Sequence, residues 1–291
     1  MKNFLLLCFI TLAQCFTPIF AKLSVAEVSP ISFGFLRFGA AAVLFYITLK
    51  INKQSFKFEK KDYPLLILLG LLCIPINQFF FLTGVKLSYA SHSGIIYSLN
   101  PVFAYLIAVT RKNEKFFFIK LFAILLTVIG IFFVFYQSFK DSSTNTVHGD
   151  ILLIIAVLSF SMYLSLGKEM IEKYGALRVT TYVFLMGSLF YIPLFIFDLH
   201  NFTLSALTYK GIIGYLYLTI VVAYFAYFAW YYALRTIAVS KLTTLSNLSP
   251  LLTVFFSIIF LSEKISVYFL LGGAITILGV LIMHKVSIEL A

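Results

Sequence analysis

The sequence predicts an all-α integral membrane protein whose ten transmembrane helices form two inverted five-helix repeats. Three observations carry this prediction. Hydrophobic residues make up 62% of the 291 positions and charged residues only 11%, whereas a soluble domain carries roughly 25% charged residues. The apolar residues gather in runs long enough to cross a bilayer. A proline-containing phrase also occurs twice, as SLNP at 98–101 and as NLSP at 247–250.

Ten apolar runs approach the length of about 20 residues that a membrane-spanning helix needs. Backbone polar groups in lipid must bond within the protein, and the runs lack the alternation of barrel strands, so we expect helices. The runs are 4–21, 30–49, 64–83, 89–110, 116–136, 150–167, 178–197, 210–231, 238–260 and 267–283.

The first run begins MKNFLLLCFITLAQC and resembles a secretory signal peptide. We expect it to stay in the protein, because the apolar stretch continues through Phe20 and its removal would leave nine spans.

The basic residues predict topology rather than a nucleic-acid surface, although the net charge is +11. They are spread over short loops. If the N-terminus is inside, fourteen of the 22 basic residues fall in cytoplasmic segments and five on the other side. The positive-inside rule therefore predicts cytoplasmic termini, in a protein of the cell (plasma or inner) membrane.

A shift of 149 positions brings the second half of the chain onto the first. The matches include Pro101 with Pro250, Glu114 with Glu263, and Gly130 with Gly279. Five spans per half is an odd number, so the second half enters the membrane inverted. The repeats are assigned to 1–140 and 150–291, and the two glutamates should lie on opposite faces. Inverted repeats in transporters place the substrate site between the halves and provide a route to alternating access.

Pro101 and Pro250 break two equivalent spans. Each proline removes a backbone donor and frees the carbonyl four residues earlier, which must face protein or a watery cavity. Asn100 and Asn247 belong to the same two phrases, so we expect paired half-sites with the prolines as hinges. The alternative is a pair of packing kinks that neighbouring helices satisfy.

These features together resemble the EamA family of the drug/metabolite transporter superfamily. The resemblance rests on the span count, the polar midpoint linker 137–149, the P-x12-E pattern in both halves and the segment FAKLSVAEVSPISFGFLRF. In that segment Lys22, Pro30 and Arg37 match residues of the family's first two helices. The resemblance implies an exporter of amino acids, nucleobases or other small metabolites, with a cavity between helices three, four, eight and nine.

The predicted cavity residues are polar or aromatic groups inside apolar runs: Asn77, Gln78, His92, Asn100, Tyr224, Tyr227, Lys241 and Asn247. Ionisable groups within a membrane are costly and usually functional. Arg37 is either a substrate or gating contact or a structural anchor. Lys120, at the start of a span, is expected to extend to the membrane interface. The small residues at 123, 127, 130, 272, 276 and 279 predict close helix packing.

No Asp or Glu lies in the middle of a run. We therefore expect an interior with positive and neutral polar groups, suited to neutral, zwitterionic or anionic solutes. The leading hypothesis is a secondary transporter that uses alternating access for efflux, with a small solute and the bilayer as partners and a homodimer as the assembly to test. We expect no enzymatic activity, cofactor, metal or nucleic acid, because catalytic motifs are absent from the sequence. A polytopic membrane enzyme or lipid-carrier handling protein, and a channel, are the alternatives.

Overall fold

The computed structural model describes residues 2–112, 114–140, 144–202, 208–230 and 248–289. Within these ranges the chain is helical and contains no strand. Eight helical segments are long and apolar enough to cross a membrane, and two shorter apolar helices, Ser249–Leu261 and Val267–Met283, follow them. The all-α, ten-span prediction is confirmed, although the ninth run is described only from residue 248 onward.

The first half contains two interrupted spans. Its helices are α1 (Lys2–Val25), α2 (Pro30–Ile51), α3 (Tyr63–Leu71), α4 (Asn77–Leu87), α5 (Ala90–Tyr97), α6 (Asn100–Thr110) and α7 (Phe118–Lys140). A 3-10 turn, Lys60–Asp62, precedes α3. A π-helical segment, Leu72–Ile76, joins α3 to α4 in one span, whereas α5 and α6 are the two halves of a broken span.

The second half begins with the long helix α8 (Thr144–Tyr174). It continues with α9 (Ala176–Asp198), a 3-10 turn (Leu199–Asn201), α10 (Tyr209–Leu216), a π-helical segment (Tyr217–Ala226), α13 (Ser249–Leu261) and α14 (Val267–Glu289). Gly175 alone connects α8 to α9, with φ of 81°. Glycine adopts this left-handed conformation without a Cβ clash, which allows the abrupt reversal.

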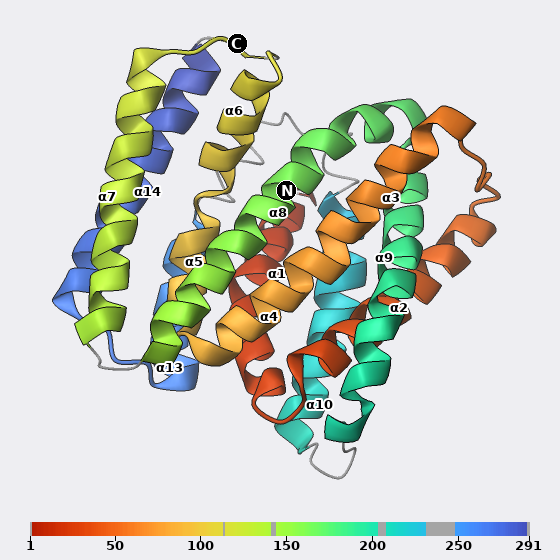
Figure 1. The fold of residues 1–291 in the computed structure, drawn as a ribbon, viewed down its shortest axis with the longest axis horizontal. Coiled ribbons are helices and arrows are strands. Elements are labelled where there is room, and N and C mark those ends of the chain that lie inside the picture. Colours follow the sequence, from red (N-terminus) through yellow and green to blue (C-terminus); the bar gives the residue numbers. More distant parts are fainter. Residues whose placement is uncertain (1, 113, 141–143, 203–207, 231–247, 290–291) are drawn as a thin grey trace.

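The halves pack with approximate two-fold symmetry. Three of the five pairs of equivalent spans pack on each other: α2 on α9, α5 on α13, and α7 on α14. The contact of α4 with α8 has its counterpart in α1 with α10, five spans along. Figure 1 shows α7 and α14 side by side at one edge of the bundle, with α2 and α9 together toward the other.

Small residues let α7 and α14 approach closely. A Cβ added to Gly130 would lie 2.3 Å from Thr276 Oγ1, and one added to Gly279 would lie 2.5 Å from Thr127 Oγ1. Each glycine therefore receives the threonine of the other repeat. The predicted packing role of this stripe is confirmed.

The outer surface of the bundle is apolar, as a bilayer requires. On α7 the side chains of Phe118, Phe122, Leu125 and Phe132 are all exposed. A patch of this kind on a water-soluble protein would promote aggregation, whereas lipid tails solvate it.

The bundle has two ends, which differ in their contacts. The connections after α2, α6 and α8 lie with the end of α14 at the C-terminal end, and those after α1, α4 and α13 lie at the opposite end (Figure 1). Glu114 lies beyond α6, with its backbone nitrogen donating to the Ala108 carbonyl. The Glu263 carboxylate contacts the first turn of α5. Because α5 and α6 form one span, the two glutamates lie at opposite ends, as predicted. We call the opposite end the Glu263 end.

Candidate functional site

Arg37 on α2 links the two repeats from inside the bundle. Only 2% of the residue is exposed. Its Nε donates to the carbonyl of Leu218 at 3.1 Å, and its Nη1 donates to Gln78 Oε1 at 3.3 Å. Leu218 belongs to the second repeat, so the guanidinium crosses the interface whose opening alternating access would require.

A chain of neutral groups extends from Arg37. Gln78 Nε2 donates to Asn77 Oδ1 at 2.5 Å, and Asn77 Nδ2 donates to Tyr97 Oη at 3.0 Å and to the Ala156 carbonyl at 2.8 Å. Asn77 and Gln78, both predicted for the cavity, are buried. The structure brings them together with Arg37 in one hydrogen-bonded network.

Two π-helical segments flank this network, and their positions in the repeats correspond. The first, Leu72–Ile76, ends directly before Asn77, and the second, Tyr217–Ala226, contains Leu218. Shifting 72–76 by 149 positions gives 221–225, inside the second segment. Wide helical turns of this kind occur often at functional sites. The first segment contains Pro75, whereas the second contains no proline.

Tyr224 lies within the second π-helical segment, and Tyr227 directly follows it. The Tyr224 hydroxyl lies 2.6 Å from Thr48 Oγ1 on α2. The Tyr227 ring meets the Phe184 ring of α9 edge-on at 5.2 Å. In this structure the two predicted cavity tyrosines therefore pack against α2 and α9.

The SLNP phrase does break its span, because α5 ends at Tyr97 and α6 starts at Asn100. Asn100 Oδ1 accepts a hydrogen bond of 2.6 Å from Ser161 Oγ on α8. This contact favours the alternative interpretation, in which the phrase is a packing kink whose polar group bonds to a neighbouring helix.

The NLSP phrase is described only in part. Pro250 lies buried in the first turn of α13. Lys241 and Asn247 lie outside the described residues.

His92 on α5 is paired with a buried carboxylate. Its Nδ1 lies 3.0 Å from both Oδ1 and Oδ2 of Asp150 on α8, and Ser88 Oγ donates to Asp150 Oδ1. The side chains of His92 and Asp150 are 1% and 0% exposed. The expectation of an interior without acidic groups is therefore wrong, because Asp150 lies far enough into α8 to be covered by α4 and α5.

Lys120, which the sequence predicts to extend to the membrane interface, is paired with an acidic residue beyond the end of α6. It is buried, its Nζ lies 3.1 Å from Glu114 Oε2, and the same atom lies 4.3 Å from the centre of the Tyr105 ring. An ion pair and an aromatic face stabilise the charge in place of water.

The Glu263 end includes a contact between the repeats and a contact within the first repeat. The Glu263 carboxylate accepts from the backbone nitrogens of Ala90 at 2.6 Å and Ser91 at 3.0 Å. These are donors of the first turn of α5, where a helix leaves its N–H groups unbonded and favours negative charge. Lys22 Nζ donates to the carbonyls of Lys86 and Ser88 at the same end.

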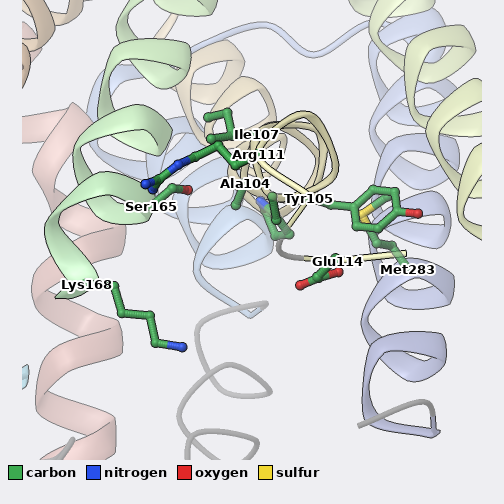
Figure 2. Close-up of a pocket in the computed structure, with 10 residues that line it drawn as sticks. Ala104, Tyr105, Ile107, Arg111, Glu114, Ser165, Lys168 and Met283 are labelled. Carbon is green, nitrogen blue, oxygen red and sulfur yellow. The ribbon is translucent and has the colours of Figure 1, made fainter. Parts of the chain in front are cut away.

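A cavity of about 390 Å³ lies at the C-terminal end. Figure 2 shows α6 side chains between α8 and α14, with Glu114 below them. The lining residues are Pro101, Ala104, Tyr105, Ile107, Ala108, Arg111, Glu114, Ser165, Lys168 and Met283. The volume is typical of a small-molecule pocket. Pro101, predicted as a hinge, lines this cavity, whereas the six described residues that were predicted to line a cavity lie elsewhere.

Sequence reasoning missed the contribution of α8. Four polar residues of this helix face the span formed by α5 and α6, at close to helical spacing. Two of them, Asp150 and Ser161, contact that span, and the other two, Ser165 and Lys168, line the cavity beside it. This spacing could have predicted a polar face of α8. Asp150, however, stands at the start of the apolar run 150–167, directly after the polar linker.

The sequence model of the EamA-like transporter family matches residues 1–136 and 147–284. The chain belongs to the EamA-like transporter family. An uncharacterized transporter from Archaeoglobus fulgidus is 28% identical over 284 residues, which cover 96% of both chains. The uncharacterized transporter YetK from Bacillus subtilis is 25% identical over 264 residues, 90% of this chain and 80% of YetK.

A solved crystal structure has the same fold. It superimposes with a TM-score of 0.66 at 16% identity and covers 98% of both chains. The two matches of the EamA-like family model fall one on each half of the chain.

Proposed function

We propose that this EamA-like protein is a secondary transporter that exports small neutral, zwitterionic or anionic metabolites by alternating access. Both termini would lie in the cytoplasm, and the repeats would be 1–140 and 150–291. The two matches of the family model and the paired packing of equivalent spans support this division.

The observation that carries the proposal is the difference between the two ends of one span. At its start, Glu263 of the second repeat bonds the backbone of Ala90 and Ser91. At its end, Arg111 and Glu114 border a cavity that α8 and α14 complete. A carrier that exposes its site to one side at a time requires this asymmetry, whereas a channel requires a continuous path.

The positive-inside rule gives the direction of the asymmetry. The C-terminal end carries the segments richest in Lys and Arg. With that end in the cytoplasm, the cavity opens inward, which is the state in which an exporter collects its solute.

The charges near the centre support the solute class. Arg37 and its neutral partners Gln78, Asn77 and Tyr97 form the inter-repeat network. The buried acid Asp150 lies at the Glu263 end beside His92. A centre with a cation and neutral amides repels organic cations and tolerates neutral, zwitterionic or anionic solutes.

Solute counterflow in proteoliposomes tests the proposal. A carrier loaded with unlabelled solute inside accelerates the entry of labelled solute, because one site alternates between the two faces. A channel gives no such acceleration, and a membrane enzyme returns a chemically changed solute. Entry that is independent of internal solute, or a changed product, would contradict transport by alternating access.

A further inference from the structure

We infer that Arg37 is the binding group for a carboxylate of the transported solute, and that the protein therefore carries organic monoanions. This inference rests on the proposed transport function. It follows from a count of the buried charges, from the geometry of the guanidinium and from its place between the repeats.

No acidic side chain that the structure describes pairs with Arg37. Of its eleven acidic residues, Asp141 lies in the midpoint linker and Glu289 near the C-terminus. The other nine have described side chains, and each of the nine bonds to a group other than Arg37. The segment 231–247, outside the described residues, contains no Asp or Glu. None of the described acidic side chains therefore supplies a negative charge at Arg37, and we assign that role to the solute.

An uncompensated buried charge is costly. The other buried basic groups that the structure describes have acidic partners: Lys120 has Glu114, and His92 has Asp150. Arg37 has two neutral oxygens instead. A buried cation that bonds only to neutral oxygens is the arrangement expected of an anion-binding site without its anion.

The hydrogen bonds of Arg37 are long enough for a solute carboxylate to replace one of them. They are 3.1 and 3.3 Å long, whereas a guanidinium–carboxylate hydrogen bond is about 2.7–2.9 Å. Bonds to the described residues use two of the five N–H donors. A carboxylate can displace the Gln78 oxygen and take two parallel hydrogen bonds, which gains both charge neutralisation and shorter contacts.

The position of Arg37 couples such binding to transport. One bond reaches Gln78, the second residue after the first π-helical segment, and the other reaches Leu218, inside the second segment. The first partner belongs to the first repeat and the second partner to the other repeat. A carboxylate that replaces one of these bonds changes the contact between the repeats.

The charge count favours a carboxylate over a phosphate. One guanidinium neutralises one negative charge, whereas a phosphate ester carries about −1.5 to −2 at neutral pH. A phosphate would therefore leave an excess negative charge in the interior.

The experiment measures ligand-induced thermal stabilisation of the full chain in lipid nanodiscs. The probes are benzoate and hexanoate, their neutral isosteres benzamide and hexanamide, and phenyl phosphate, all at matched concentrations. The parent should be stabilised by at least one carboxylate and not by its amide, with phenyl phosphate weaker. Arg37→Met should lower carboxylate affinity roughly 10- to 100-fold, as expected for loss of a hydrogen-bonded charge partner.

Three further variants separate binding from structure. Arg37→Lys retains the charge without the planar fork, so it should bind carboxylates more weakly than the parent but better than Arg37→Met. Gln78→Met removes the competing oxygen and should bind as well as the parent or better. Lys120→Met, which removes a buried cation that has its own acidic partner, is the matched control and should leave probe affinity unchanged.

The ligand-free proteins supply a second readout. If Arg37 awaits an anion, Arg37→Met without probe should unfold at the same temperature as the parent or a higher one. A clear fall in that temperature, or failure of Arg37→Met to fold, would identify a structural anchor and overturn the inference. Equal stabilisation by acids and amides, or no stabilisation by either carboxylate, would overturn it as well.

Counterflow in the same variants keeps the two proposals distinct. Exchange of a solute that runs equally in the parent and in Arg37→Met would overturn the carboxylate site and leave the transporter proposal intact. Absence of exchange in the parent, together with carboxylate binding that requires Arg37, would support the site and contradict transport.

Discussion

The two ends of the span formed by α5 and α6 differ in the burial of their contacts with the second repeat. At its start, the first turn of α5 is bonded by Glu263, and His92 is bonded by Asp150. At its end, Arg111 makes an exposed ion pair with Glu169 beside the cavity. The contacts at the start of this span are buried and directional, whereas the Arg111–Glu169 pair at its end is exposed.

This difference indicates which contacts set the conformation. A hydrogen-bonded charge that is excluded from water is strong and costly to break, whereas an exposed ion pair contributes little. Substitutions of Glu263 or Asp150 should therefore alter stability and the balance of states, whereas loss of the exposed Arg111–Glu169 pair should alter neither much.

Asp150→Ala should have the largest effect. It leaves His92 and Ser88 without their buried partner, and breaking a buried pair costs about 3–5 kcal/mol. Unfolding in nanodiscs, followed by the loss of tertiary signal with temperature or denaturant, measures the loss. The double variant His92→Leu, Asp150→Leu should be less destabilised than the sum of the two single changes. A loss below about 1 kcal/mol for Asp150→Ala would remove the basis for treating this pair as a closure of the Glu263 end.

Glu263→Gln should release the start of α5. The amide keeps one acceptor but loses the charge, and hydrogen bonds to charged groups exceed neutral ones by about 1–2 kcal/mol. The ratio of closed to open states should then fall about 5- to 30-fold.

Labelling of Ser91→Cys by a membrane-impermeant maleimide measures that ratio, in a background without Cys8, Cys15 and Cys73. Glu172→Gln, which removes one member of an exposed pair with Lys168, is the matched control and should leave labelling unchanged. Equal labelling with and without the Glu263 charge would show that Glu263 does not hold this end.

Asn100→Ala tests whether the SLNP phrase is a half-site or a kink. Loss of the bond from Ser161 should cost about 0.5–1.5 kcal/mol of stability. Because the two side chains share one bond, adding Ser161→Ala should cost little more. Counterflow in the same variant decides function: a half-site predicts a fall in transport larger than the loss of folded protein, and a packing kink predicts none.

Glu169→Gln should have the smallest effect. The Arg111–Glu169 pair spans 3.2 Å, with side chains 37% and 57% exposed. Such pairs contribute about 0–1 kcal/mol, and salt screens them. Unfolding midpoints at low and high salt measure the change. A loss comparable to that of Glu263→Gln would erase the contrast between the two ends.

Much of the fold was predictable from the sequence. Each apolar run is a local property, because the free energy of moving a residue into lipid adds along the chain. The repeat is also visible in the sequence, because matching residues stand 149 positions apart: the prolines of the two phrases, Glu114 with Glu263, and Gly130 with Gly279. The span count and the opposite placement of the glutamates followed from these features.

The site was predictable only in part. Arg37, Asn77 and Gln78 stood out as polar groups in apolar runs, but their mutual hydrogen bonds did not. The partners of His92 and Asn100 lie on α8, 58 and 61 positions away. Hydropathy does not encode which face of α8 turns toward the broken span.

The amino-acid sequence alone predicts that the chain enters the membrane as helices and that its second half repeats the first in inverted form. The tertiary structure decided which buried charges are paired: Asp150 with His92, Glu114 with Lys120, and no carboxylate among the described residues with Arg37. The physical reason is distance. Apolar burial depends on the residue and its neighbours along one helix, whereas a charge is compensated only within a few ångströms, and the rotation and crossing of packed helices set that separation.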